Sequence, residues 1–471
     1  MKRHHFALLA WLAWGPVAAL AHEPDVFATT TSVTGEAVYD VDHTSRPCHF
    51  GNLPEQLSLE ETVSRILCHD PQVRIAWADA KARAATVGVS HAAYLPRLDG
   101  RLDWSRNINE RKEESVSVNG RRQLAGANFT LSWVLFDFGR RGAALQNARQ
   151  MLMAANATQD ATLQNAFAVA AQAYNDALAA QRNLAASRQV AELAAQNLEA
   201  ADAKYKAGAA ALSDQLQAQT ALSQARLREV RDIGNLRQLL GVIALRMGLS
   251  PETPLKLAGD LAPLPNPFFS KAVDKLLAEA RREHPALLAA QARFKAAEAS
   301  VEEARAAGRP SLSLTANLAH NRVGQSEIYN GDYRERDRSI GLQLDVPLFD
   351  GFSRSYQVRR ALAQVESRRS ELADTEQQVS LDVWNNYQRL SIETRSLAQT
   401  SELVEQSRQA LDVVQGRYRA GVGSMIELLN ALTAYASAEE LHTQALGSWQ
   451  SSRLRLAVGL GRLGFWAVDT R

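Results

Sequence analysis

The stretch that decides the fold is Leu135-Phe136-Asp137-Phe138-Gly139-Arg140-Arg141, because it returns in altered form as Leu348-Phe349-Asp350-Gly351-Phe352-Ser353-Arg354. The two aspartates are 213 residues apart. Four other landmarks recur in the same order at this offset or one residue more: Asp70-Pro71 with His284-Pro285, Leu95-Pro96 with Arg309-Pro310, Tyr174 with Tyr387, and Tyr205-Lys206-Ala207-Gly208 with Tyr418-Arg419-Ala420-Gly421. Ordered matches of this kind indicate a duplication. The sequence therefore predicts two tandem repeats, over 57–249 and 269–462, joined by a proline-rich linker at 250–268.

Each repeat reads as helix, strand, strand, long helix and helix. The long helices are predicted over 139–206 and 352–419; the first contains no proline, and its apolar residues recur at steps of three and four. Towards the end of both helices the step becomes a heptad, which is typical of a coiled-coil seam. The heptad residues are Leu184, Ala191, Leu198 and Tyr205, and then Leu397, Val404, Leu411 and Tyr418. A helix of this length would reach about 100 Å. Shorter helices are predicted at 211–248 and 424–461.

Four stretches alternate apolar and polar residues and are predicted to be strands: 96–106, 125–136, 310–319 and 338–349. In the first stretch Leu98, Leu102 and Trp104 share one face, while arginines and aspartates share the other. Each stretch is long enough for a tilted strand to cross a membrane. The polar stretches 107–123 and 319–338 are predicted to be outward loops.

The first 21 residues have the pattern of a secretory signal peptide. Lys2 and Arg3 precede an apolar run, and Ala19-Leu20-Ala21 fits a cleavage site. Residues 22–56 would then be an N-terminal extension, and 463–471 a tail. The chain has 53 Lys and Arg against 51 Asp and Glu, so it would be neutral without the signal. Nothing in this balance favours a nucleic-acid partner.

The chain has two cysteines, Cys48 and Cys68. Export would permit a disulfide between them, and the sequence leaves open whether it forms. No cysteine directly follows the cleavage site, where residue 22 is a histidine, so a lipoprotein anchor is not indicated.

The alternating strands pose a problem of closure. After residue 21 no stretch of 18 apolar residues occurs, so a bilayer-spanning helix is not expected. Four strands cannot enclose a water-filled lumen, and lipid does not tolerate open sheet edges. Several chains that each contribute four strands would solve the problem. The residues alone do not choose between three chains and four, and a soluble pair of hairpins packed on helices stays open as an alternative.

The start of the first repeat resembles TolC-type outer-membrane efflux proteins. The resemblance is carried by Leu57-Ser58-Leu59-Glu60-Glu61, Asp70-Pro71 and Tyr94-Leu95-Pro96, and by the paired Leu-Phe-Asp and Tyr-x-x-Gly turns. It covers about residues 57–462. It implies a mainly α fold with a membrane β-barrel: a homotrimer with a 12-stranded barrel in the outer membrane and a 12-helix tunnel in the periplasm. It also implies two partners, a periplasmic adaptor and an inner-membrane transporter.

Two turns are expected at the periplasmic tips, where Gly208 and Gly421 follow the heptad seams and can take the left-handed conformation that ends a helix. With Tyr205 and Ser424 they form the candidate docking surface. As plain helical hairpins these turns would have only a structural role.

The resemblance implies a gate just beyond the tips. The family carries two acidic residues, three apart, after the second tip; this sequence has Glu427 and Asn430, and the first repeat has Asp214 and Gln217. Glu427 also fits a capping box that begins at Ser424, which would be a structural role. Gly423 stands where a well-known member of the family has an arginine that links neighbouring helices. Tyr418 matches the aromatic residue that takes part in that link.

Four residues are expected at junctions between strands and helices. Asp137 and Asp350 can cap the long helices, because a carboxylate there accepts from free backbone N–H groups. Pro96 and Pro310 are expected to mark the passage from helix to strand.

The sequence predicts no enzyme. It contains no phosphate-binding glycine loop and no zinc-ligand spacing, so no cofactor is expected. The leading hypothesis is a passive outer-membrane duct for type I secretion of a protein toxin, as in systems that export adenylate cyclase–haemolysin, driven by a transporter of ABC type. A duct for a multidrug or metal efflux pump is the close alternative. A soluble periplasmic coiled-coil adaptor or scaffold is the alternative of another class.

Overall fold

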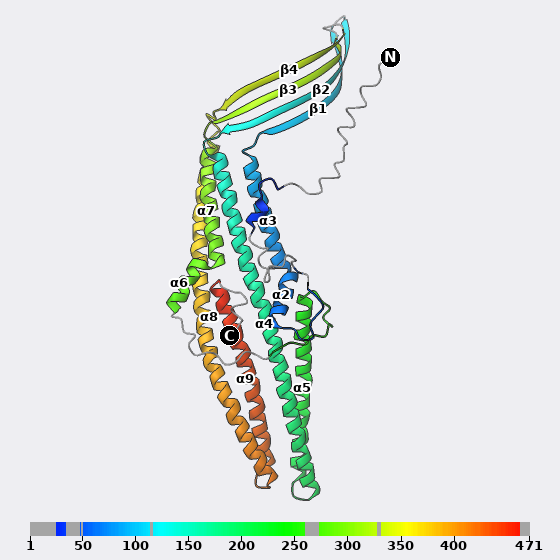
Figure 1. The fold of residues 1–471 in the computed structure, drawn as a ribbon, viewed down its shortest axis with the longest axis vertical. Coiled ribbons are helices and arrows are strands. Elements are labelled where there is room, and N and C mark those ends of the chain that lie inside the picture. The colour runs from blue at the N-terminus through cyan, green and yellow to red at the C-terminus, as the bar shows by residue number, and fades with distance from the viewer. Residues whose placement is uncertain are drawn as a thin grey trace.

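The computed structural model describes residues 25–33, 48, 50–113, 116–259, 273–326 and 331–461. The expected signal peptide and tail, and parts of the N-terminal extension and linker, lie outside the described residues. The molecule is elongated, with a sheet at one end and helices that run away from it to two separate tips (Figure 1). The order helix, strand, strand, long helix, helix occurs twice, as α3-β1-β2-α4-α5 and α7-β3-β4-α8-α9.

The first helix of each half is two helices rather than one. Prolines begin the second of each pair: α2 (Leu59–His69) is followed by α3 (Pro71–Ala92), and α6 (Val273–Glu283) by α7 (Pro285–Ala306). Proline suits the first position of a helix because its missing N–H would have no partner there. The preceding residue supplies the cap. The Asp70 carboxylate accepts from Gln72 N at 2.7 Å.

His284 caps α7 in the same way, since its Nδ1 accepts from the backbone N of Ala286 at 3.2 Å. This bond needs an unprotonated Nδ1. Burial lowers the pKa of His284, while the nearby Asp382 carboxylate opposes the shift. The burial therefore favours the form of the ring that can cap the helix.

Two long helices run the length of the molecule. They are α4 (Arg140–Lys206) and α8 (Ser353–Arg419), each of 67 residues, or about 100 Å. They are followed by α5 (Leu212–Arg246) and α9 (Met425–Gly459). Within the described residues, no helix combines the length and the apolar character needed to cross a bilayer.

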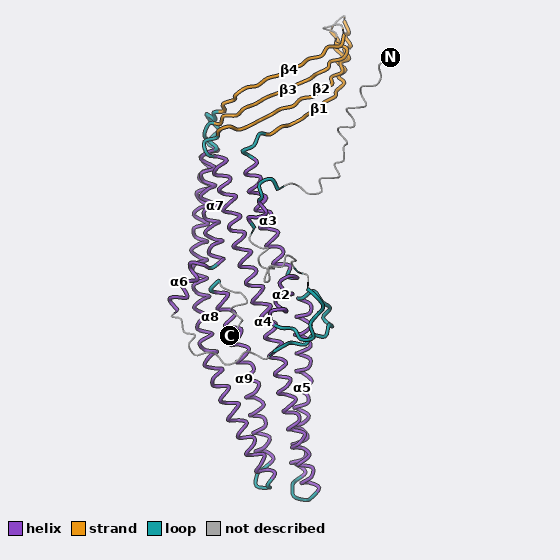
Figure 2. Tube along the Cα trace, viewed as in Figure 1, coloured by secondary structure: helices purple, strands orange, loops and turns teal. Residues whose placement is uncertain are grey.

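The helices lie side by side in a layer that continues from the sheet to the tips (Figure 2). Next to the sheet, α3 packs on α4, α4 on α7 and α7 on α8. Towards the tips, α5 packs on α4, α4 on α9 and α9 on α8. The full-length helices α4 and α8 thus connect the two halves, and the short helices fill the places beside them.

The sheet has the order β1-β2-β3-β4 with antiparallel neighbours. Its strands are β1 (Arg97–Glu113), β2 (Val116–Phe136), β3 (Ser311–Ser326) and β4 (Gly331–Asp345). The prediction of loops at 107–123 and 319–338 was therefore wrong for most of both stretches. Backbone pairing does not require apolar side chains, so the hairpins continue through polar residues. The fourth strand also ends before the predicted 349, at Asp345, shortly before Pro347, which has no N–H for a ladder.

The largest core lies midway along the helices, where α2, α4, α5 and α9 meet the segments around Leu57 and Leu257. Those two residues pair as a short parallel bridge. The hydroxyl of Tyr174 on α4 lies within hydrogen-bond distance of the carbonyl oxygens of Leu57 and Ala258. Burial raises the pKa of Tyr174 to about 12. This tyrosine therefore ties two chain connections to the long helix.

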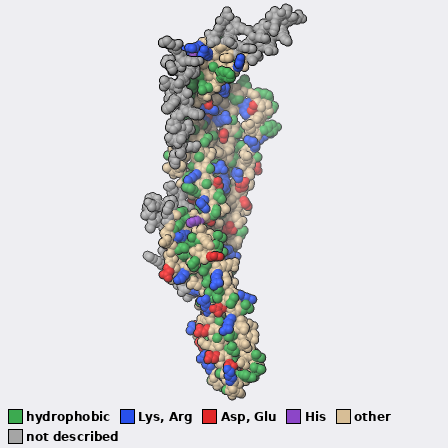
Figure 3. All heavy atoms as spheres, turned by 90° about the vertical axis from the view of Figure 1, so that its right-hand side faces the viewer, with side chains coloured by type: hydrophobic (Ala, Val, Ile, Leu, Met, Phe, Trp, Pro, Cys, Tyr) green, Lys and Arg blue, Asp and Glu red, His purple; other side chains and the backbone are tan. Residues whose placement is uncertain are grey.

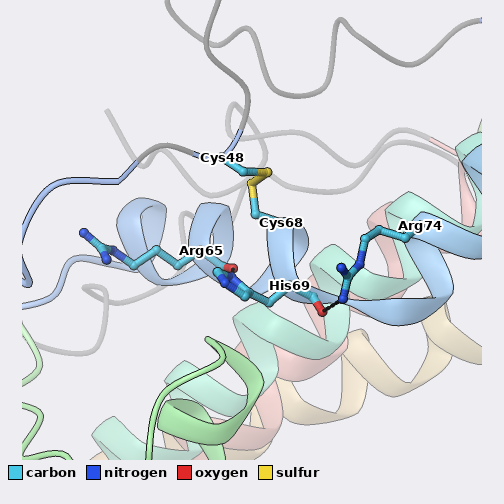
Figure 4. Close-up of a disulfide and its surroundings, with 5 residues drawn as sticks. All are labelled: Cys48, Arg65, Cys68, His69 and Arg74. Atoms are coloured by element: carbon cyan, nitrogen blue, oxygen red, sulfur yellow. Dashed lines mark hydrogen bonds between the residues drawn. A yellow bond between two sulfur atoms is a disulfide. The ribbon is translucent and has the colours of Figure 1, made fainter. Parts of the chain in front are cut away.

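A disulfide joins Cys48 in the N-terminal extension to Cys68 near the end of α2 (Figure 4). The two Cα atoms are 5.6 Å apart. On the same helix His69 accepts from Arg74 through its backbone oxygen. The disulfide fastens the extension to the central core region.

Candidate functional site

The two tips close with the same backbone turn. Gly208 has φ +73° and Gly421 has φ +81°, the left-handed conformation that glycine adopts without strain. The N–H of Ala209 donates to the Lys204 carbonyl at 2.8 Å, and that of Val422 donates to the Arg417 carbonyl at 3.0 Å. These bonds satisfy carbonyl groups at the helix ends and return the chain towards the sheet.

The helices that leave the tips start differently. In the second tip the Ser424 Oγ accepts from the backbone N of Glu427 at 3.2 Å, so serine caps α9. The Glu427 carboxylate lies 3.7 Å from the Arg417 guanidinium, with both groups half exposed. Both residues belong to one hairpin, so this pair does not bind the two hairpins together. In the first tip the residue before α5, Ala211, offers no side-chain cap.

A lysine that sequence reasoning missed connects the two hairpins. The Lys204 ammonium on α4 donates to the backbone oxygen of Tyr418 on α8. It also lies 4.0 Å from the centre of the Tyr418 ring, a cation–π contact. The 213-residue repeat offset could have identified this lysine, because it pairs Lys204 with Arg417. Both cations lie one helical turn before a tip.

Tyr418 is buried at this contact, with 3% of its surface exposed. Burial and the nearby Asp214 carboxylate raise the pKa of its hydroxyl. Within the described residues this hydroxyl has no hydrogen-bond partner, and neither does the buried Oε1 of Gln217. The structure thus brings Asp214 and Tyr418 together, whereas Asn430 is exposed.

Gly423 lies in a crowded part of the second tip. A Cβ atom added there would lie 3.0 Å from the Tyr418 backbone nitrogen and 3.2 Å from the Arg417 carbonyl carbon. The tight turn explains why this position lacks a side chain. In this chain Lys204, from the other hairpin, supplies a cationic contact to Tyr418.

Below these polar contacts a single apolar core joins all four helices of the tip region. It contains Ala201 and Ala218 from the first hairpin and Leu411, Met425 and Leu428 from the second. The apolar core and Lys204 therefore both oppose separation of the hairpins, while exposed Tyr205 lies outside the buried core.

At the opposite end of α4, Arg141 fastens the helix to the sheet. The Asp137 carboxylate accepts from the Arg141 backbone N at 3.0 Å and from its Nε at 2.9 Å. The Arg141 guanidinium also donates to the Val134 carbonyl at 2.7 Å and to the Ala93 carbonyl at 3.3 Å. It stacks on Tyr94, with 4.7 Å between the guanidinium carbon and the ring centre. One side chain therefore joins a helix, a strand end and the turn before β1.

The second half repeats this aspartate–arginine clamp with fewer hydrogen bonds to neighbouring carbonyl groups. The Asp350 carboxylate accepts from the Arg354 backbone N at 3.1 Å and from its Nε at 2.8 Å. Arg354 Nη1 donates to the Gly308 carbonyl at 3.2 Å. Pro96 and Pro310 each occupy the last position before a strand, β1 and β3 respectively. Both arginines were missed by sequence reasoning, although Arg141 and Arg354 share the repeat offset.

A cavity of about 560 Å³ opens beside the first clamp. Its lining mixes charges of both signs from α4, α7, the turn after α7 and the end of β4, including Arg140, Glu303, Arg309 and Asp345. No cluster of His, Cys, Asp and Glu in the described ranges is arranged to hold a metal ion.

Comparison with known proteins gives a consistent result. A model of the outer membrane efflux protein family matches residues 62–245 and 276–462. Protein CyaE of Bordetella pertussis is 32% identical over 94% of this chain and 92% of its own length. The alkaline protease secretion protein AprF of Pseudomonas aeruginosa is 25% identical over 83% of this chain and 82% of its own length. The crystal structure of the outer membrane protein VceC from Vibrio cholerae has the same fold, with a TM-score of 0.72 and 20% identity over 86% of this chain and 96% of that one.

Proposed function

The chain belongs to the outer membrane efflux protein family, and we propose that three copies of it form a passive exit duct for type I secretion of a protein toxin. The protein is an outer-membrane channel whose helices extend into the periplasm. In the proposed trimer, two tandem repeats per chain supply a 12-stranded barrel and a 12-helix tunnel. A periplasmic adaptor and an inner-membrane transporter of ABC type would complete the machine.

The observation that carries the proposal is a sheet with one apolar face and two open edges. On β1, Leu98, Leu102 and Trp104 are 68%, 81% and 70% exposed, and on β4 Ile340 and Leu342 are similarly exposed. These residues suit contact with lipid, yet β1 and β4 each pair with only one neighbour in the described chain. Unpaired backbone groups are costly in hydrocarbon, so β4 of one copy is expected to pair with β1 of the next.

The helical layer supports the same arrangement. Helices α8 and α5 lie at its two borders towards the tips. Both borders expose apolar residues, including Ile392 and Val413 on α8 and Leu227 and Val230 on α5. Two different surfaces that both need cover suit a head-to-tail contact, which closes into a ring when the rotation between copies is right.

The tips are the proposed site of gating and docking. In a trimer Asp214 and Glu427 would each be present three times at the tunnel mouth, and rings of carboxylates favour cations over anions. The exposed turn at Gly208 and the turn at Gly421 with Ser424 would receive the adaptor. The proposed duct is not an enzyme, so the free energy for transport comes from its partners.

Protein export is favoured by the relative AprF, an alkaline protease secretion protein. The second candidate is a duct for small molecules. It is supported by OpmQ of Pseudomonas aeruginosa, named for pyoverdine export, which is 25% identical over 87% of this chain.

Three experiments test the proposal. Native mass spectrometry of the detergent-purified protein should give a trimer, and planar bilayers should show discrete conductance steps. A monomer that dissolves in buffer without detergent would refute the channel. Expression in a host whose type I exporter lacks its outer-membrane channel should restore toxin release. Restored drug resistance without toxin release would favour the small-molecule duct.

A further inference from the structure

The stretch 334–338 of strand β4 separates its charges by face. It reads Arg334-Glu335-Arg336-Asp337-Arg338, and successive side chains of a strand point to opposite faces. The three arginines therefore share one face, and the two acids share the other. Ile340, Leu342 and Leu344 lie on the face of the arginines. The arginines thus continue the apolar face towards the hairpin end.

On the neighbouring strand the residues directly opposite these arginines are not acidic. Across the β3–β4 ladder Arg334 faces Arg322, and Arg336 faces His320. Arg334, Arg336 and Arg338 are exposed, and among the described residues none of the three has an ion-pair partner.

This arrangement differs from the helical part of the molecule. Figure 3 shows Lys, Arg, Asp and Glu side chains mixed along the helices on the face that it draws. We call the three arginines, Arg334, Arg336 and Arg338, the basic belt. It has a single sign of charge, and it borders an apolar surface rather than a polar one.

The height of the basic belt matches the edge of a bilayer. The apolar residues of this face run on past the strand end to Val346 and Leu348, so Leu344 lies in their middle. Arg338 is six residues from Leu344 towards the hairpin end, or about 20 Å. At the tilt of about 45° usual for membrane strands, this is about 14 Å along the membrane normal, close to half of a hydrocarbon core of about 30 Å. Arg336 and Arg334 lie still further out, at the level of lipid head groups.

We propose that the basic belt binds the phosphate groups of a phosphorylated lipid in the outer leaflet of the membrane. The assignment of the leaflet rests on the proposed function, in which the helices extend into the periplasm and the hairpin ends point outwards. A guanidinium matches phosphate geometry with two parallel hydrogen bonds. The apolar residues below the belt would contact the acyl chains of the same lipid, so an amphiphile fits this surface better than a free anion or a protein.

Native mass spectrometry of the full-length oligomer can test the proposal with lipid A as the probe. The bisphosphorylated form should bind, and the form without phosphates should bind on the order of 100-fold more weakly, as should R334Q/R336Q/R338Q with the phosphorylated lipid. This magnitude assumes roughly a fivefold loss for each arginine that no longer meets an anionic head group. The matched control is E335Q/D337Q, which changes the other face of the same strand and should bind as the wild type does.

Equal binding of the two lipid forms by the wild-type protein would overturn the proposal, and this comparison needs no variant to fold. Equal loss in the control variant, or displacement of the lipid by millimolar inorganic phosphate, would also overturn it. Channel formation is measured separately by conductance in bilayers. A protein that conducts but ignores the phosphates refutes only the lipid site, whereas a protein that forms no channel refutes the proposed function.

Discussion

Replacing Lys204 by methionine is expected to loosen the contact between the two helical hairpins at the tips. Methionine keeps most of the length and the apolar stem of lysine but removes the charge. The backbone oxygen of Tyr418 would lose its ammonium donor, and the Tyr418 ring would lose its cation. The apolar core beneath would remain, so the tip should open more often without unfolding.

The expected size of the effect follows from these two contacts. A hydrogen bond to a charged group contributes about 1.5–3 kcal/mol, and a cation–π contact about 0.5–2 kcal/mol. Because Lys204 is only partly buried, we take the lower end of both ranges, about 2 kcal/mol in total. This corresponds to a roughly 30-fold shift of the equilibrium towards separated hairpins in each copy.

The assay is the fraction of time that single channels spend in their high-conductance state in planar bilayers. The matched control is Lys206→Met, because among the described residues Lys206 pairs only with Asp202 on its own helix, at 2.6 Å, and is largely exposed. Tyr418→Leu should remove the cation–π part alone and combine less than additively with Lys204→Met. The reasoning is wrong if the Lys204 and Lys206 variants behave alike.

Three further predictions concern stability. Arg141→Ala should lower the free energy of unfolding by about 3 kcal/mol, because it leaves the nearly buried Asp137 carboxylate without its partner. The control Arg140→Ala should change the free energy of unfolding little. Chemical denaturation compares the two variants. Reducing the disulfide, or replacing Cys48 and Cys68 by serine, should cost about 3 kcal/mol for a loop that spans 20 residues, and an unchanged melting temperature under reductant would contradict this. Because burial lowers the pKa of His284, the unfolded chain binds a proton before the folded chain does, so stability should fall as pH drops below about 6.5. His284→Asn keeps a helix cap and should weaken this pH dependence in thermal melts; an identical pH profile would argue against the assignment.

The strands show where local patterns stop being informative. Apolar alternation located the parts of all four strands that carry the apolar face, but it ended each hairpin too early. The residues beyond Arg106 and Ala319 are mostly polar, and the sequence was read there as loop. The structure pairs them because a ladder already formed by the apolar part extends through the backbone, whatever the side chains are.

The sequence by itself determined the long helices, the alternating faces of the strands and the turns at both tips. These features depend on residues close together in the chain: uninterrupted heptads, a period of two, and glycine after a seam. Only the tertiary structure decided that Lys204 meets Tyr418, that Arg141 reaches the carbonyl of Ala93, and that Arg334 of β4 faces Arg322 of β3. Each of these contacts joins elements whose spatial arrangement depends on how helices and strands pack. A local sequence pattern carries no information about the distance between such elements.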